Sequence, residues 1–114
     1  MSEIPDITVI GTELASKKIT SIELLARHLE KIKKFESTLN CFVSIDEASA
    51  KEDAEASDRR YKEGSPLSLI DGIPIALKDN MHVNGLPTCN GTTLTFPFGV
   101  EAYVTEKLRA AGAV

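Results

Sequence analysis

The fold of this chain is decided by the run Asp71-Gly72-Ile73-Pro74-Ile75-Ala76-Leu77-Lys78-Asp79-Asn80. The triplet Ile70-Asp71-Gly72 is typical of a turn. Residues 73–77 carry no polar side chain on either of their alternating faces, which predicts a buried strand. Because proline cannot donate a hydrogen bond to a neighbouring strand, Pro74 should lie near the start of this strand or at the edge of its sheet.

Upstream of this strand the sequence predicts amphipathic helices. Asp6 can cap a first short helix, whose apolar residues recur at helical spacing before the polar residues 16–18. Thr20 and Glu23 then have the spacing of a capping box, which marks the start of a second helix. One apolar stripe runs along that helix and is formed by Ile22, Leu25, Leu29, Ile32 and Phe35.

Two further helices and a long loop complete the predicted organisation. Ser44 and Glu47 offer a second capping box at the start of an alanine-rich helix. Residues 101–111 form the last predicted helix, with Gly112 as its C-terminal cap. Between these helices, residues 85–99 hold three glycines and two prolines and predict a long loop. Loops of this length in a small domain often carry functional sites.

The composition argues against several classes of partner. Thirteen Lys and Arg against seventeen Asp and Glu give a net charge of -4 and a pI near 5.2. This acidic balance and the absence of tryptophan disfavour direct binding of nucleic acid or of an anionic membrane. No apolar stretch approaches the ~20 residues of a transmembrane helix, and the first residues do not resemble a secretory signal. We therefore expect a cytoplasmic protein.

The cysteines and histidines predict neither a disulfide nor a metal site. Cys41 and Cys89 are expected to be small buried thiols, as is usual in a reducing compartment. His28 and His82 lie far apart in the sequence, and neither has a metal-ligand spacing with the cysteines. We therefore expect no metal and no cofactor.

Lys78 is the residue that could carry chemistry, and two interpretations of it are open. It ends the apolar run and is followed by Asp79 and Asn80. In the first interpretation the lysine leaves the core for solvent and pairs with a carboxylate, as most lysines do. In the second, burial favours the neutral amine, which can act as a general base. The residues alone do not decide between them.

A second candidate region is the polar, glycine-bearing loop of residues 88–93, which could line a pocket. Cys89 in this loop is disfavoured as a nucleophile, because no histidine is placed by a motif to activate it. The sequence contains no phosphate-binding loop and no nucleophile-elbow motif. Nucleotide binding and the α/β-hydrolase pattern are therefore unsupported.

The chain resembles the N-terminal portion of the amidase signature family. The resemblance is carried by residues 71–80, by the Gly-Leu-Pro-Thr of residues 85–88, and by residues 101–104 and 107–114. The upstream helices and residues 19–24 are also similar to that family, so the resemblance covers nearly the whole chain. The run Gly-Ile-Pro-Ile-Ala-Leu-Lys-Asp-Asn is its most specific part.

The resemblance implies a serine amidohydrolase that uses a Ser, cis-Ser, Lys triad, with Lys78 as the lysine. Asp79 and Asn80 would then hold the end of the strand in place. The pocket would be bordered by a short stretch of the loop, made up of Thr88, Cys89, Asn90 and Gly91. The segment that carries both serines in the family follows the region where this chain ends. The 114-residue chain by itself is therefore expected to be inactive.

The resemblance also implies an α/β fold with a mixed sheet covered by helices. Residues 1–114 would be one partial domain that supplies outer helices and the first core strands. The expected partner is a small-molecule amide substrate, and homo-oligomer formation is compatible with the family. Two alternatives stay open. One is the A subunit of a glutamine-dependent aminoacyl-tRNA amidotransferase, and the other is a non-catalytic fragment that binds a partner through the surface of residues 22–35.

Overall fold

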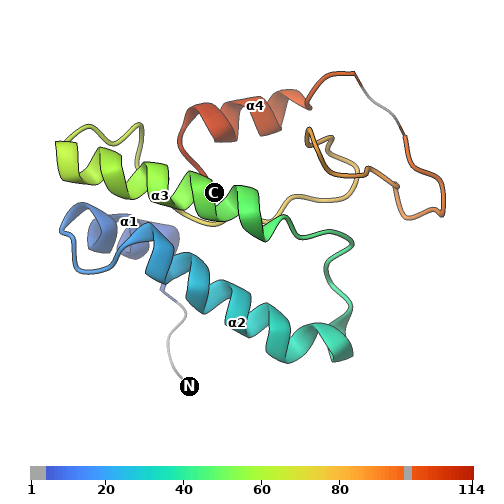
Figure 1. The fold of residues 1–114 in the computed structure, drawn as a ribbon, viewed down its shortest axis with the longest axis horizontal. Coiled ribbons are helices and arrows are strands. Elements are labelled where there is room, and N and C mark those ends of the chain that lie inside the picture. The colour runs from blue at the N-terminus through green and yellow to red at the C-terminus, as the bar shows by residue number, and fades with distance from the viewer. Residues whose placement is uncertain (1–4, 97–98) are drawn as a thin grey trace.

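The computed structural model describes residues 5–96 and 99–114 and contains four helices in that part of the chain (Figure 1). These are α1 (Ile7–Ala15), α2 (Ser21–Leu39), α3 (Glu47–Glu63) and α4 (Tyr103–Ala110). The four helices predicted from the sequence are therefore confirmed. None of the described helices is both long and apolar enough to cross a membrane.

The first two helices begin where their capping residues predict. The side chain of Asp6 accepts hydrogen bonds from the amides of Thr8 and Val9, both at 2.9 Å, at the start of α1. At the start of α2, Thr20 and Glu23 form both bonds of the capping box. These bonds satisfy amides that have no partner inside the helix.

The third helix starts at a different cap from the predicted one. Asp46, and not Ser44, is the N-cap of α3, and its carboxylate accepts a hydrogen bond from the amide of Ser49 at 3.0 Å. The predicted capping box of Ser44 and Glu47 is therefore wrong. A carboxylate at the N-cap is favoured both as an acceptor and by the helix dipole, so Asp46 replaces the serine two residues earlier.

The last helix is shorter than predicted. It begins at Tyr103, two residues after the predicted start, and its N-cap Ala102 makes no side-chain hydrogen bond. At its other end, Gly112 follows the C-cap Ala111 and has φ of +86°, the left-handed conformation that often ends helices. Gly112 therefore ends α4 as predicted.

The hydrophobic core lies where α1, the start of α2 and the end of α3 meet. Helices α2 and α3 pack against each other (Figure 1). Only the first part of the predicted apolar stripe of α2 is buried: Leu25 is 6% exposed, whereas Phe35 is 47% exposed. The core cluster is made up of Leu14, Ile19, Leu24, Tyr61 and Ile73.

Residues 73–77 do not form the predicted strand, and no strand occurs in residues 5–96 and 99–114. Two backbone hydrogen bonds nevertheless join this segment to Val114. The Val114 amide donates to the Ile73 carbonyl at 3.0 Å, and the Ile75 amide donates to the Val114 carbonyl at 2.8 Å. Val114 thus bonds the residues before and after Pro74, which is the hydrogen-bond pattern of two parallel strands.

The prediction of burial on both faces is also wrong for most of this segment. Ile73 is buried, but Ile75 and Leu77 are half-buried and Ala76 is exposed. A pair of segments joined by two hydrogen bonds is too small to cover both faces, because a sheet needs several neighbouring strands to be stable. The apolar side chains of residues 73–77 favour burial, but in the described chain only Ile73 is buried.

Candidate active site

The segment that carries Lys78 begins at a buried ion pair. The side chain of Asp71 is 0% exposed and that of Arg60, on α3, is 24% exposed. Arg60 donates through Nε to Oδ2 of Asp71 at 2.8 Å and through Nη2 to Oδ1 at 2.5 Å. The amide of Leu67 donates to Oδ2 at 2.8 Å. This fork geometry is the strongest arrangement available to an arginine and a carboxylate.

Asp71 and Arg60 shift each other's pKa. Burial of Asp71 opposes its ionisation, but the hydrogen bonds from Arg60 and from the Leu67 amide outweigh burial, so the pKa of Asp71 is lowered. The hydrogen bond with Asp71 raises the pKa of Arg60. The sequence predicts Asp71 only as part of a turn, because an ion pair between residues 11 positions apart has no spacing signature.

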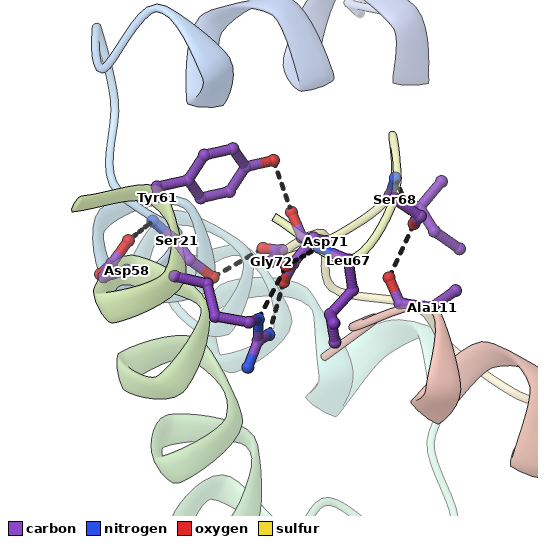
Figure 2. Close-up of polar contacts among 10 residues, drawn as sticks. Ser21, Asp58, Tyr61, Leu67, Ser68, Asp71, Gly72 and Ala111 are labelled. Carbon is purple, nitrogen blue, oxygen red and sulfur yellow. Dashed lines mark hydrogen bonds and ion pairs between the residues drawn. The ribbon is translucent and has the colours of Figure 1, made fainter. Parts of the chain in front are cut away.

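Further hydrogen bonds surround the ion pair. The Tyr61 hydroxyl donates to the carbonyl of Asp71 at 3.1 Å, and the Ser21 hydroxyl donates to the carbonyl of Gly72 at 2.7 Å (Figure 2). Burial raises the pKa of Tyr61. Ser68 donates to the carbonyl of Ala111 at 2.7 Å, next to the end of α4. The turn before the Lys78 segment is therefore fixed to α2, to α3 and to the end of α4.

Lys78 itself is exposed in the described chain, as the first of its two interpretations expects. Its carbonyl accepts a hydrogen bond from the Met81 amide at 2.9 Å, which turns the backbone directly after the lysine. Lys78 lines a groove of about 800 Å³, and burial would require the open side of this groove to be covered. Apolar residues of the groove lining include Leu25, Leu29, Ile32, Leu77, Leu86 and Leu108.

Asp79 joins the Lys78 segment to the loop of residues 88–91. Its Oδ1 accepts a hydrogen bond from the Cys89 amide at 3.1 Å, and its carbonyl accepts one from the Asn90 amide at 3.2 Å. Its Oδ2 is buried without a hydrogen-bond partner in the described part of the chain. The structure thus brings Asp79 and the predicted pocket loop together. Asn80 is exposed and lies along the same groove.

The four predicted pocket residues divide into two groups. Asn90 and Gly91 line the groove with Lys78, whereas Thr88 and Cys89 are outside its lining. Thr88 is 2% exposed and its hydroxyl lies 3.0 Å from Nδ1 of His82. Thr88 is therefore buried beneath the loop, whereas Asn90 and Gly91 face the groove.

The cysteines of the described chain are free thiols. Cys41 is exposed, which contradicts its predicted burial, and Cys89 is half-buried. Cys41 is exposed because it lies in the connection between α2 and α3, outside the core cluster. Across residues 5–96 and 99–114, no cluster of His, Cys, Asp or Glu has the arrangement needed to hold a metal ion.

A family model described as Amidase matches residues 23–114, a span that includes Lys78 and both segments around it. The chain belongs to the amidase family. It is 40% identical over 112 residues to the putative amidase AmiA2 of Mycobacterium tuberculosis, and the match covers 97% of this chain and 23% of that protein. It is 37% identical over 118 residues to the A subunit of the glutamyl-tRNA(Gln) amidotransferase of Chloroflexus aurantiacus, covering 100% of this chain and 24% of that protein.

Solved structures of amidases share this fold. The peptide amidase of Stenotrophomonas maltophilia matches with a TM-score of 0.87 and 26% identity, over 96% of this chain and 23% of that one. A crystal structure titled as an amidase matches with a TM-score of 0.87 and 31% identity, over 96% of this chain and 25% of that one. These neighbours have the α/β amidase signature fold. The chain spans about a quarter of the length of the relatives it matches.

Proposed function

We propose that the intact protein containing this chain hydrolyses carboxylic amides, with Lys78 as the base of a Ser, cis-Ser, Lys triad. Residues 1–114 would be the N-terminal segment of one amidase domain. The observation that carries the proposal is the family match over residues 23–114, which includes the run from Asp71 to Asn80. The position of Lys78 on the groove, with Asp79 bonded to the adjoining loop, supports the assignment.

The proposed reaction proceeds through an acyl-enzyme. The neutral amine of Lys78 accepts a proton from the bridging serine, which takes one from the nucleophilic serine. The nucleophilic oxygen attacks the carbonyl carbon, and backbone amides stabilise the resulting oxyanion. The carbon–nitrogen bond then breaks, and the leaving amine takes the proton that Lys78 holds. Water hydrolyses the ester and regenerates the serine. Both serines belong to the part of the family domain outside these 114 residues.

For this chemistry Lys78 has to lose its exposure. A covered groove would remove water from the lysine, and removal of water favours the neutral amine that the reaction requires. The groove volume of about 800 Å³ lies within the ~300–1,000 Å³ of typical small-molecule sites. Its leucine-rich lining favours a substrate with an apolar acyl or amine group. We include a cytoplasmic location in the proposal, because both cysteines are free thiols.

A second candidate function is that of an amidotransferase A subunit. The 37% identity to the Chloroflexus aurantiacus protein over the whole chain favours it. Both candidates break the carbon–nitrogen bond of an amide. They differ in whether the released nitrogen compound leaves the protein or, as ammonia, is transferred to another substrate. The identity to the putative amidase of Mycobacterium tuberculosis is slightly higher, 40%, so we place the free-standing amidase first. A non-catalytic binding role is the third alternative, with the surface of residues 22–35, where Phe35 is exposed, as the contact surface.

The test is an assay of carboxylate and amine or ammonia release from a panel of acylamides, and of ammonia release from glutamine, using the intact protein. Lys78→Ala should lower the rate of release by about 10²–10⁴-fold, whereas Lys31→Ala, at an exposed position on α2, should leave it unchanged. Release from acylamides without partner proteins supports the amidase. Release from glutamine that depends on partner proteins and a charged tRNA would identify the amidotransferase. No release under either condition would contradict both.

A further inference from the structure

The Asp71–Arg60 ion pair lies where the Lys78 segment meets the end of the chain. Besides its bonds to Arg60 and to the Leu67 amide, the carboxylate packs directly on Gly112. A Cβ atom at position 112 would lie 2.5 Å from Oδ1 of Asp71, so only glycine permits this approach. Gly112 also has φ of +86°, which glycine adopts without strain.

The same residues set how two backbone segments are aligned. The amide of Gly72, the neighbour of Asp71, donates to the carbonyl of Gly112 at 2.9 Å. This bond precedes the two bonds that join Ile73 and Ile75 to Val114. All three bonds have one partner in residues 72–75 and the other in residues 112–114. The ion pair therefore stands at the beginning of a short parallel alignment.

The alignment decides where Lys78 lies. Successive side chains of an extended segment point to opposite faces, so a shift of one residue moves every side chain to the other face. Lys78 follows three residues after Ile75, the last residue bonded to Val114. A shifted alignment would carry the lysine away from the groove and from the loop that Asp79 holds.

We propose that Asp71 and Arg60 are positioning residues for Lys78. The carboxylate, held by both arginine nitrogens and the Leu67 amide, fixes residues 72–75 in one alignment with residues 112–114. This inference rests on the proposed function for its catalytic consequence, whereas the alignment itself can be measured without any activity. Neither residue contacts the groove surface around Lys78, so both act through the backbone.

The first experiment is hydrogen exchange in the intact protein, with Arg60→Gln compared with Arg59→Gln. Both variants remove one positive charge from α3, but only Arg60 binds Asp71. In Arg60→Gln the amides of Gly72, Ile75 and Val114 should exchange at least about tenfold faster, while amides inside α2 keep their rates. Arg59→Gln should leave all of these rates unchanged. Equal acceleration throughout the protein, or no acceleration at the three amides, would overturn the proposal.

The second experiment measures amide turnover per folded molecule. Arg60→Lys keeps the positive charge but cannot bind Asp71 through two nitrogens at once. If Arg60 acted through its charge alone, kcat of this variant would equal that of the unaltered protein. We expect kcat to fall by about 10²-fold with KM nearly unchanged, as for a misplaced catalytic group. An unchanged kcat in a folded Arg60→Lys protein would overturn the positioning role. If the unaltered protein turns over no amide, the proposed function fails, and the exchange experiment still decides the alignment.

Discussion

Replacement of Gly72 by alanine tests how tightly the turn before Lys78 is packed. Gly72 has φ of +80°, a conformation that costs an alanine about 1–2 kcal/mol. The added Cβ would also lie 2.9 Å from the Ser21 hydroxyl and would overlap the Ser57 hydroxyl. Both serines are fully buried, so neither can move aside freely. Overpacking of this kind costs about 1–3 kcal/mol, and the free energy of unfolding should fall by about 2–5 kcal/mol in total.

Gly85→Ala is the matched control for this prediction. Gly85 has φ of +88°, but a Cβ atom there would meet nothing within 4 Å. It should therefore cost only the backbone strain of about 1–2 kcal/mol. Urea denaturation of both variants gives the comparison, since the change in unfolded-chain entropy is the same in each. The packing argument is refuted if Gly72→Ala destabilises no more than Gly85→Ala.

Three further predictions concern the caps and contacts of the same structure. Asp71→Asn should cost about 3 kcal/mol, because it leaves Arg60 without its partner. Since the folded pKa of Asp71 is lowered, its contribution is complete above the ordinary aspartate pKa of 3.8 and is lost as the pH falls below it, so acid titration should show a weaker pH dependence in this variant. Thr20→Ala should cost about 1 kcal/mol in urea denaturation through loss of the capping box, and an unchanged midpoint would contradict that role. Asp79→Ala should speed hydrogen exchange at the Cys89 amide, and an unchanged rate would show that the bond does not hold the loop.

The helices were predictable because their signals are local. Thr20 and Glu23 satisfy each other within one turn, and the capping box was read directly from their spacing. The start of α3 was misplaced because Ser44 and Asp46 are both good caps within three residues of each other. Local spacing ranked the serine first, whereas the folded chain uses the carboxylate.

The segment of residues 73–77 was harder to predict because burial depends on neighbours that a local pattern does not show. Its apolar character correctly indicates a core position at Ile73, but the described chain leaves Ala76 and Lys78 exposed. Asp71 was missed for the same reason. An aspartate before a glycine is typical of a turn, and nothing in the local sequence shows that Arg60 enters from α3 to neutralise it.

Within the candidate site, the structure brings together several of the residues that the sequence predicts, but their arrangement could not be predicted. Lys78, Asn80, Asn90 and Gly91 share one groove, and Asp79 connects the two segments that carry them. The roles of these residues in catalysis stay predictions. The contact between Asp79 and Cys89 spans ten residues of irregular chain, which no periodicity encodes.

The most direct test of the account is the rate of amide hydrolysis by the intact protein and by its Lys78→Ala variant, measured at equal concentrations of folded protein. If Lys78 is the base, the variant should retain its fold, because the side chain lies outside the core cluster of the described chain. Its kcat should fall by about 10²–10⁴-fold, the contribution of general acid–base catalysis. A folded Lys78→Ala protein that hydrolyses amides at the unaltered rate would contradict the account.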